Sequence, residues 1–277
     1  MSHQVKRTLK TACKYLLLSL GGFVMIFPFA WMILTSLKTL PEAEMIPPSF
    51  FPSEFVWSNY TDAMKAAPFG RYFFNTIIVA VVGALLTVIL TVLAAYAFAV
   101  YEFRGKKFLF AAFLTTMMVP AELLIIQNYV TVTHFGWLDT YQGIILPLLV
   151  SGFYIFMARE YFSQMPAVLF KAAYVDGCNG WRYLWKVMVP MNKNAIATIG
   201  ILSFISYWNT FMWPLMVTNS DSYRTLSIGL LFYNYAVSNQ TNMQMAGTTI
   251  VLLPMVIFYL IFHKKIIEGV SRSGIKG

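Results

Sequence analysis

Long runs without a charged residue dominate this sequence and limit what it can fold into. They include residues 15–37, 72–101 and 194–220. Each run matches or exceeds the roughly 20 residues that a helix needs to cross the hydrocarbon core of a bilayer. Only 11% of the 277 residues are charged and 58% are hydrophobic, so polar side chains are too few to cover a soluble globule. The sequence therefore predicts a polytopic, all-α membrane protein and excludes a disordered chain or a secreted disulfide scaffold.

The basic residues predict how the chain threads through the membrane. We expect six transmembrane helices, near residues 15–37, 73–100, 108–130, 141–158, 195–217 and 246–262. With this assignment, 16 of the 20 Lys and Arg residues fall in the segments that the positive-inside rule places in the cytoplasm, together with both termini. The net charge of +9 thus reports topology, and nucleic acid is not an expected partner.

The expected organisation has a cytoplasmic N-terminus (1–14), a first span (15–37), an external loop (38–71), a membrane core (72–262) and a cytoplasmic tail (263–277). The first apolar run is too long for a signal-peptide core and no small-residue cleavage site follows it, so we interpret it as an uncleaved span. The external loop is rich in proline and aromatic residues, with one short helix predicted at Asn59–Ala66. It suits either an interfacial aromatic belt or a docking surface for a partner. The outer segment 218–245 is polar and nearly uncharged, and suits a neutral, hydroxyl-bearing ligand or partner.

The cytoplasmic segment 159–194 carries more apolar surface than a solvated linker needs. Pro166 can open a helix, and Gly177 stands where that helix would stop in a left-handed residue. A second helix can begin at Asn179 as its N-cap. Its apolar stripe would consist of Trp181, Leu184, Trp185 and Met188, with Arg182 and Lys186 facing away. On physical grounds alone, a pair of amphipathic helices lying on the inner leaflet remains open beside a rigid docking element.

These residues also carry a resemblance to a known family. Lys171–Cys178, followed by Trp181, Val189 and Pro190, resembles the EAA loop of ATP-binding-cassette (ABC) importer permeases, whose pattern is Glu-Ala-Ala, three residues to Gly, and a later apolar-Pro. Further matches to the sugar-importer branch follow in chain order: Phe27-Pro28-Phe29, Thr35–Lys38, Asn59-Tyr60, Asn75-Thr76, Trp208-Asn209, Trp213-Pro214, Glu268-Gly269 and Gly274–Gly277. Because they cover nearly the whole chain in order, they are more specific than any single motif. The chain resembles the second permease subunit of maltose-type and multiple-sugar importers.

The resemblance implies the type I ABC importer permease fold and a translocation subunit of a binding-protein-dependent sugar importer in a bacterial cytoplasmic membrane. Oligosaccharides are the favoured cargo, although polyols, sugar phosphates and sugar acids also use this branch. The implied partners are a second homologous permease, two cytoplasmic ATPase subunits and an extracytoplasmic solute-binding protein. ATP and magnesium would be held by the ATPase subunits, and no cofactor is expected in this chain.

The resemblance also assigns the residues that would couple the chain to the ATPases. They are Lys171, Ala172, Ala173, Asp176, Gly177, Trp181 and Pro190. Small Ala172 and Ala173 would seat a short helix closely in a groove of one ATPase, and the Gly177 turn would aim that helix. Two departures from the family pattern stand out. Lys171 occupies the usual glutamate position, so an acidic contact there is lost or reversed, and Asn194 stands where proline is common.

No residue pattern indicates that the chain does chemistry by itself. Gly269 and Gly274 have the spacing of a phosphate-binding loop, but Ile275 occupies its lysine position. The three histidines, His3, His134 and His263, are isolated, so we expect neither a metal cluster nor a catalytic constellation. A secondary transporter is the alternative function, and a membrane-embedded enzyme is a third.

Polar and aromatic residues inside the predicted spans are the candidates for a translocation pathway. They are Asn75, Glu122, Asn128, Tyr129, Tyr207, Trp208, Asn209 and Trp213. Aromatic faces stack on sugar rings and amides bind hydroxyls, although each residue also suits interhelical hydrogen bonding or interface anchoring. Glu122, the sole acid within a predicted span, is expected to have a structural or cavity-lining role rather than one in proton coupling.

Overall fold

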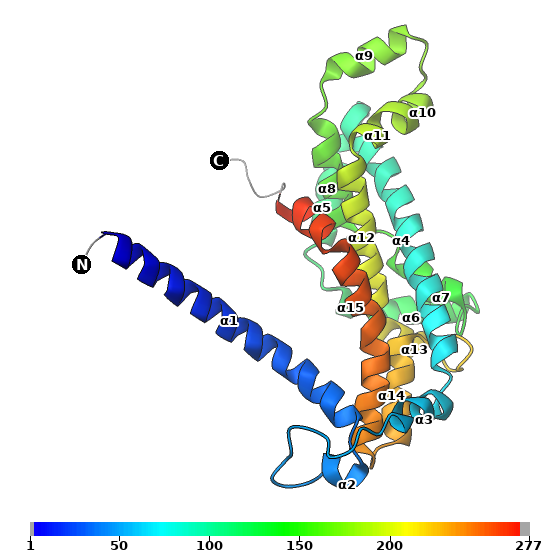
Figure 1. Cartoon of the computed structure of the whole chain (residues 1–277). Helices are drawn as coiled ribbons and strands as arrows, with labels where there is room; N and C mark the ends of the chain where they lie inside the picture. The colour runs from blue at the N-terminus through cyan, green and yellow to red at the C-terminus, as the bar shows by residue number, and fades with distance from the viewer. Residues whose placement is uncertain (1–2, 272–277) are drawn as a thin grey trace. The chain divides into compact units, whose positions relative to one another are not determined.

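The computed structural model describes the backbone of residues 3–271 and the side chains of residues 10–264 except Ala121. Within this range every regular element is a helix, as the all-α prediction requires (Figure 1). The chain divides into two compact units, Met1–Pro68 with Leu230–Val256 and Phe69–Gly229 with Ile257–Gly277, which we call unit 1 and unit 2 and describe separately. The final element of the family resemblance, Gly274–Gly277, lies outside the described residues.

The elements follow one another as short and long helices joined by tight turns. In chain order they are α1 (His3–Ser36), α2 (Leu40–Ala43), α3 (Ser58–Ala66), α4 (Phe69–Val100), α5 (Lys106–Thr116), the 3-10 turn η1 (Ala121–Leu124), α6 (Ile125–His134), α7 (Tyr141–Ile145), the 3-10 turn η2 (Leu146–Leu148), α8 (Gly152–Ser163), α9 (Ala167–Val175), α10 (Gly180–Tyr183), the π turn η3 (Leu184–Met188), α11 (Val189–Met191), α12 (Lys193–Asn209), α13 (Met212–Val217), α14 (Leu226–Ala236) and α15 (Thr241–Ser271).

Three of the six predicted spans are confirmed as long apolar helices. The stretches long and apolar enough to cross a bilayer are Lys10–Ser36, Phe69–Val100 and Thr241–Lys264. Two bent pairs add one candidate each: Tyr141–Leu148 with Gly152–Ser163, bent by 53°, and Gly180–Met191 with Lys193–Asn209, bent by 83°. By length and composition, the described residues thus hold three helices that could cross a membrane, or up to five if each bent pair counts as one span.

The prediction of one continuous helix over 108–130 is wrong. α5 ends at Thr116, and the chain turns before Pro120, which precedes η1 and then α6. Proline excludes its preceding residue from the helical region and cannot donate a backbone hydrogen bond, so the apolar run breaks there. The predicted helices 141–158 and 195–217 are also interrupted: Ser151 caps a fresh start for α8, accepting from the Tyr154 amide at 3.4 Å, and Thr210 is extended between α12 and α13.

The outer segments contain more helix than their composition indicated. The helix expected at Asn59–Ala66 is confirmed as α3, and the short α2 precedes it. The segment 218–245, expected to be a polar loop, instead holds α14 and the start of α15. α14 forms because its apolar side chains find a core: Ile228 is fully buried, and Tyr233 is 2% exposed.

Asn59 organises unit 1. Its buried side-chain amide donates to the carbonyl oxygens of Ser36 at 2.8 Å and Lys38 at 2.9 Å, and so joins α3 to the end of α1. Asn242 of α15 donates to the Asn59 side-chain oxygen at 3.2 Å. The Tyr60 hydroxyl lies 2.6 Å from that of Ser36. The Asn59-Tyr60 pair found in the sequence therefore fixes where α1 ends and the segment 38–71 begins.

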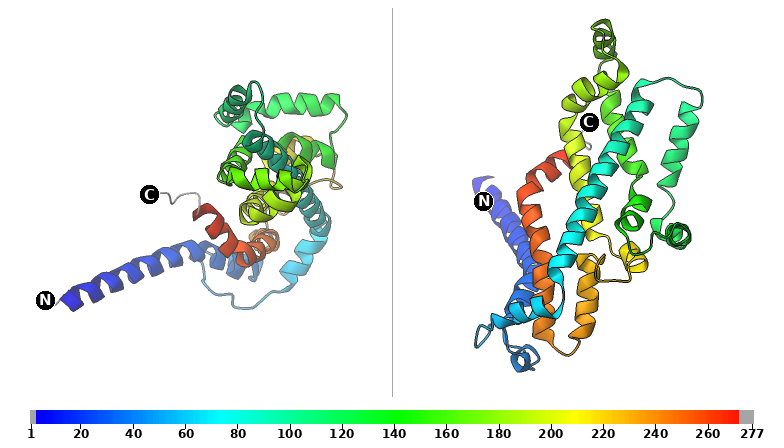
Figure 2. Two further views of the ribbon diagram at one scale, coloured as in Figure 1. Left: turned by 90° about the horizontal axis from the view of Figure 1, so that it is seen from above. Right: turned by 90° about the vertical axis from the view of Figure 1, so that its right-hand side faces the viewer.

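Unit 2 is built around α4, which packs against α8 and α12 (Figure 2). Small residues on α4 let these helices approach closely, since Ala80 is fully buried and a side chain at Gly83 would lie 2.7 Å from the Tyr207 ring of α12. From Thr76 to Tyr96 an ideal helix rises about 30 Å, which is the thickness of a hydrocarbon core. Polar contacts of α4 lie near both of these positions, and Thr87, between them, lies 3.4 Å from the Tyr207 hydroxyl.

Gly247 of α15 should not accept an alanine. The added Cβ would lie 2.3 Å from the Tyr233 ring, which is held in place because its hydroxyl donates to the Met243 carbonyl at 2.8 Å. We expect Gly247→Ala to destabilise unit 1 by about 1–3 kcal/mol through overpacking. Gly22→Ala is the matched control, since nothing lies within 4 Å of its added Cβ and alanine favours a helix. Thermal unfolding in detergent tests this, and an unchanged melting temperature for Gly247→Ala would contradict it.

Candidate functional sites

Helix α9 ends in a hydrogen-bonded turn that Gly177 makes possible. Gly177 has φ +77°, in the left-handed region that residues with a Cβ avoid. The amides of Gly177 and Cys178 donate to the carbonyls of Tyr174 at 3.0 Å and Ala173 at 2.9 Å, the pair of bonds that defines a Schellman motif. The predicted glycine stop is confirmed, and it fixes the direction in which the chain leaves α9.

The outer side of α9 and its turn is exposed and largely apolar. Val175 is 84% exposed, Tyr174 73% and Val168 71%. Lys171, Ala172, Asp176 and Gly177 are exposed as well, whereas Ala173 is buried. The two alanines that were expected to seat together in a groove thus face different ways, and only Ala172 is available to another protein. An exposed apolar patch of this kind marks an interaction surface.

The second helix of this segment begins as predicted and then departs from the prediction. Asn179 caps α10 by accepting from the Arg182 amide at 2.8 Å. The helix then widens into η3, and the predicted stripe divides: Leu184 and Met188 are buried, but Trp181 is 61% exposed. A π turn holds more residues than an α turn, so positions that share one face of an α-helix separate. Pro190, in α11, is exposed.

A continuous core ties the segment 166–191 to the long helices of unit 2. The buried members of this cluster are Val92, Ala95, Tyr96, Ala158, Phe162, Ala173, Tyr183, Leu184, Met188 and Ile199. They come from α4, α8, α9, α10, η3 and α12. The Tyr96 hydroxyl donates to the Gly180 carbonyl at 2.9 Å, and a Cβ at Gly180 would lie 2.3 Å from the Tyr101 hydroxyl. Because close-packed side chains resist deformation, a force applied to α9 or α10 reaches these helices.

A polar cluster holds the other end of α4. Asn75 is fully buried, and its amide donates to the carbonyls of Ser222 at 3.0 Å and Arg224 at 2.9 Å. Its side-chain oxygen accepts from the Tyr141 hydroxyl at 2.7 Å. Thr76 accepts from the Leu226 amide at 2.7 Å, at the start of α14. We call Asn75 and Thr76 with these partners the α4 clamp.

Two carboxylates outside the spans secure the clamped segment. Asp221 accepts from the Tyr72 hydroxyl at 2.7 Å and from the Arg224 guanidinium at 2.6 Å. The hydrogen bond from Tyr72, followed by Arg224, lowers the pKa of Asp221 below its ordinary value. A carboxyl group whose pKa is lower in the folded state than in the unfolded state stabilises the fold at pH values above its unfolded-state pKa. This stabilisation is lost only when acid protonates the carboxylate, so the contact is intact at neutral pH. Asp139 similarly accepts from the backbone amides of Asn219 and Ser220, both at 3.1 Å.

Of the remaining pathway candidates, some are buried in the packed interior and the others are exposed or half-buried. Trp208 is buried between the rings of Phe73 and Phe204, and Trp213 is buried with its indole donating to the Gly143 carbonyl at 3.1 Å. The other candidates differ in exposure: Glu122 and Asn209 are exposed, and Asn128 and Tyr129 are half-buried. Asn75 and Trp213 thus use their polar groups within the fold.

Tyr207 belongs to a cavity of about 210 Å³, and all but one of its lining residues carry a hydroxyl group. Its lining residues are Thr87, Leu148, Ser151, Tyr154, Ser203, Ser206, Tyr207 and Thr210. They come from α4, η2, α8 and its N-cap, α12 and the residue after it. No lining residue carries a formal charge. We call this the hydroxyl cavity.

Most residues of the hydroxyl cavity were missed at the sequence level. The signal was available on α12, where Ser203, Ser206, Tyr207 and Thr210 have the i, i+3, i+4, i+7 spacing of one helix face. Thr87 and Tyr154 carried no such signal. They join the cavity only because α4 and α8 pack beside α12.

Comparison with known proteins shows which family this chain resembles. Residues 88–272 match the family of binding-protein-dependent transport system inner membrane components. The arabinooligosaccharides transport system permease protein AraQ of Bacillus subtilis (strain 168) is 31% identical over 257 residues, covering 91% of each chain. The lactose transport system permease protein LacG of Rhizobium radiobacter is 28% identical over 273 residues, covering 99% of each chain.

A solved structure shares the fold. The crystal structure of a bacterial ABC transporter involved in the import of the acidic polysaccharide alginate contains a chain that matches with a TM-score of 0.83. The two chains are 24% identical, and the match covers 95% of this chain and 98% of the other. The chain as a whole therefore has an ABC importer permease fold. The chain is a member of the binding-protein-dependent transport system inner membrane component family.

Proposed function

We propose that this chain forms one half of a heterodimeric pathway that imports a neutral oligosaccharide through a bacterial cytoplasmic membrane. The family supplies the transport role, and the names of AraQ and LacG favour sugar as the cargo. The observation that carries the substrate class is the hydroxyl cavity, because uncharged hydroxyl-bearing side chains can exchange hydrogen bonds with a sugar but cannot neutralise an ion.

The orientation follows from the basic residues and from α4. Six crossings with both termini in the cytoplasm agree with the clustering of Lys and Arg. The segments 106–134, 141–163 and 193–217 would each cross the membrane as a broken helix, which is tolerated where the freed backbone groups are buried in protein. The segment 166–191 would then lie in the cytoplasm and the α4 clamp at the outer surface.

The energy for transport would come from a pair of ATPase subunits docked on the segment 166–191. Val168, Tyr174 and Val175 are exposed, while the inner side of the same segment is built into the core of unit 2. Reversing a conformational ratio from about 1:99 to 99:1 takes roughly 5.5 kcal/mol, which a loosely attached linker could not transmit. A second permease and an external solute-binding protein would complete the importer.

Reconstitution tests this function directly. Proteoliposomes holding the complex should accumulate a radiolabelled oligosaccharide only when ATP and the solute-binding protein are both present. Uptake driven by a proton gradient without ATP would replace the proposal by a secondary transporter. Accumulation of a charged solute in place of a neutral one would overturn the substrate class while leaving the ATP-driven mechanism in place.

Filling the hydroxyl cavity should slow uptake. Ser206 is the exposed member of the cavity lining, so Ser206→Leu can be accommodated without disturbing the buried core. We expect the uptake rate to fall about threefold, because a leucine replaces one hydrogen-bonding group and narrows the opening. Asn209→Leu, also exposed on α12 but outside the cavity, is the matched control. A larger loss for Asn209→Leu would place the pathway along the Asn209 face instead.

A further inference from the structure

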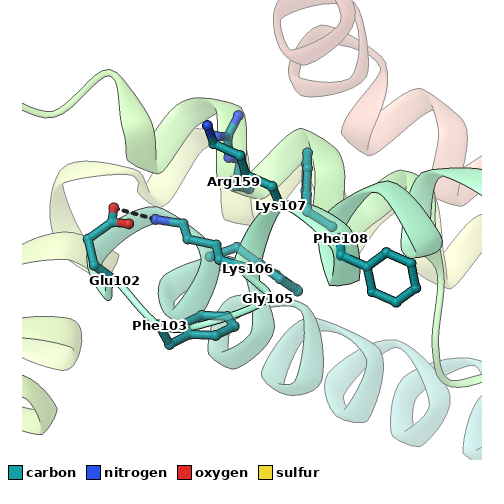
Figure 3. Close-up of a pocket in the computed structure, with 9 residues that line it drawn as sticks. Glu102, Phe103, Gly105, Lys106, Lys107, Phe108 and Arg159 are labelled. Carbon is teal, nitrogen blue, oxygen red and sulfur yellow. Dashed lines mark hydrogen bonds and ion pairs between the residues drawn. The ribbon is translucent and has the colours of Figure 1, made fainter.

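A second pocket, unrelated to the hydroxyl cavity, lies at the junction of α4, α5 and α8. It has a volume of about 640 Å³, and four charged side chains border it: Glu102, Lys106, Lys107 and Arg159 (Figure 3). The remaining lining residues are Phe98, Phe103, Gly105, Phe108 and Phe110. The pocket therefore has an aromatic floor with cationic groups around it.

The charges of this pocket leave a positive excess. Lys106 pairs with Glu102 at 2.8 Å, as the dashed line in Figure 3 marks, and Arg159 pairs with Glu160. Lys107 and the neighbouring Arg104 form no ion pair among the described residues.

Arg159 is held so that it can receive a further acceptor. Its guanidinium carbon lies 4.8 Å from the centre of the Phe110 ring. Its Nε is buried and has no hydrogen-bond partner among the described residues. A buried donor without an acceptor is costly. The Arg159 side chain as a whole is 31% exposed and lines the pocket, so a phosphate there can pair with the accessible part of its guanidinium.

An apolar groove continues from this pocket along the outer face of α5. It is lined by Phe108, Ala111, Ala112, Thr115, Thr116 and Val119, and shares Phe108 with the pocket. These positions follow the i, i+3, i+4 spacing of one helix face, while Phe110 and Phe113 of the same helix pack inward on Phe98, with centroids 5.4 and 5.7 Å away. From Phe108 to Thr116, where α5 ends, the helix rises about 12 Å, enough to lie along part of an acyl chain. The cationic pocket and the apolar groove are therefore adjacent and share Phe108.

We propose that this site binds one anionic phospholipid, with its phosphate beside Lys107 and Arg159 and one acyl chain along α5. Tyr101, at the start of the loop before α5, lies near Gly180, so this pocket is at the end of unit 2 that carries the segment 166–191. The assignment of that end of unit 2 to the cytoplasmic leaflet rests on the proposed function. The proposal that this site binds a phospholipid does not depend on that function. Juxtamembrane basic clusters on that side attract anionic headgroups.

A helix of another subunit is the competing occupant of the groove, because Ala111 and Ala112 would allow close helix packing. The charge of the adjoining pocket favours the lipid. A packed helix offers apolar side chains to the groove and nothing to Lys107 or Arg159, whereas a phospholipid satisfies the groove and the cations together.

Photolabelling of the intact, purified complex tests the proposal. The probe is phosphatidylglycerol with a diazirine in one acyl chain, presented in phosphatidylcholine nanodiscs, and labelled peptides are identified by mass spectrometry. We expect labelling of residues 108–119, an about fivefold loss in Lys107→Glu, and a comparable loss in Ala112→Phe, which blocks the groove but keeps the charges. Lys193→Glu is the matched control, an exposed lysine outside the pocket, and should label as the wild type does.

Each alternative has its own outcome. Equal labelling by the phosphatidylcholine probe would overturn the headgroup selectivity. Displacement of the probe by millimolar inorganic phosphate would show a free-anion site in place of a lipid site. Absence of label on α5 in the intact complex would show that a neighbouring helix covers the groove. Because labelling requires neither ATP nor sugar, it succeeds or fails independently of the proposed transport function.

Discussion

Gly177→Val should reduce sugar uptake by the reconstituted complex to background. Valine at φ +77° is strained by at least about 1–2 kcal/mol, and nothing lies within 4 Å of the new Cβ, so the backbone itself bears this strain. Its relief moves φ to negative values and breaks the two hydrogen bonds that close α9. The exposed apolar side of α9 then points away from the ATPase groove in which we propose that it docks. We expect normal assembly, normal engagement of the solute-binding protein, and loss of sugar-stimulated ATP hydrolysis.

Two further variants test whether the loss of uptake comes from the changed geometry of this turn or from backbone strain in general. Gly177→Asn keeps the left-handed conformation at low cost and should retain most of the uptake. Gly136→Val introduces the same kind of strain, since Gly136 has φ +66° and open space around it, but at a turn outside the segment 166–191. It should also retain most of the uptake. Equal losses at Gly136 and Gly177 would mean that strain alone explains the result, and full coupling in Gly177→Val would refute the docking assignment.

Asn75→Leu should prevent the complex from accumulating in the membrane. Leucine has nearly the same volume but leaves the Ser222 and Arg224 carbonyls without their donor and the Tyr141 hydroxyl without its acceptor. Because the partner groups are only part-buried, each of the three lost hydrogen bonds costs about 1 kcal/mol, and the combined cost is roughly 3 kcal/mol. A loss this large is a substantial fraction of the stability of a typical domain. Thermal unfolding of the purified complex and its yield measure the effect.

The same experiment separates a structural role from a pathway role. Asn128→Leu is the control, because Asn128 is half-buried and its side chain forms no hydrogen bond among the described residues. We expect its melting temperature to be unchanged, so that any loss of uptake reports on transport alone. If Asn75→Leu instead assembled with a normal melting temperature but failed to transport, Asn75 would act on the solute and not on the fold.

The features predicted well from the sequence are those set by neighbouring residues. Gly177 ends α9 and Asn179 starts α10 because a helix stop needs a left-handed residue, and a start needs an acceptor for its free amides. The helices at 15–37, 73–100 and 246–262 were equally accessible, since an uncharged apolar run of that length is itself the signal.

Two features were predicted poorly, for different reasons. The 108–130 run has the length and composition of a span, yet it breaks before Pro120, and this proline was a local signal already present in the sequence. The stripe through Trp181 and Leu184 assumed an α-helix, and the π turn divided it. The spacing of apolar residues predicts which of them share one face of a helix only if the type of helix is already known. Here packing against α4 and α8 determines the type of helix.

The sequence by itself determined that this chain crosses a membrane, where its basic residues gather and where a rigid turn interrupts the segment 159–194. Only the tertiary structure decided which polar residues are free to act. It buried Asn75 in the α4 clamp, placed Thr87 and Tyr154 beside Tyr207, and brought Arg159 of α8 to Lys107 of α5. Length, charge and capping are local properties of the chain. A polar group's role instead depends on which partners folding brings within hydrogen-bond distance, and those partners here lie tens of residues away.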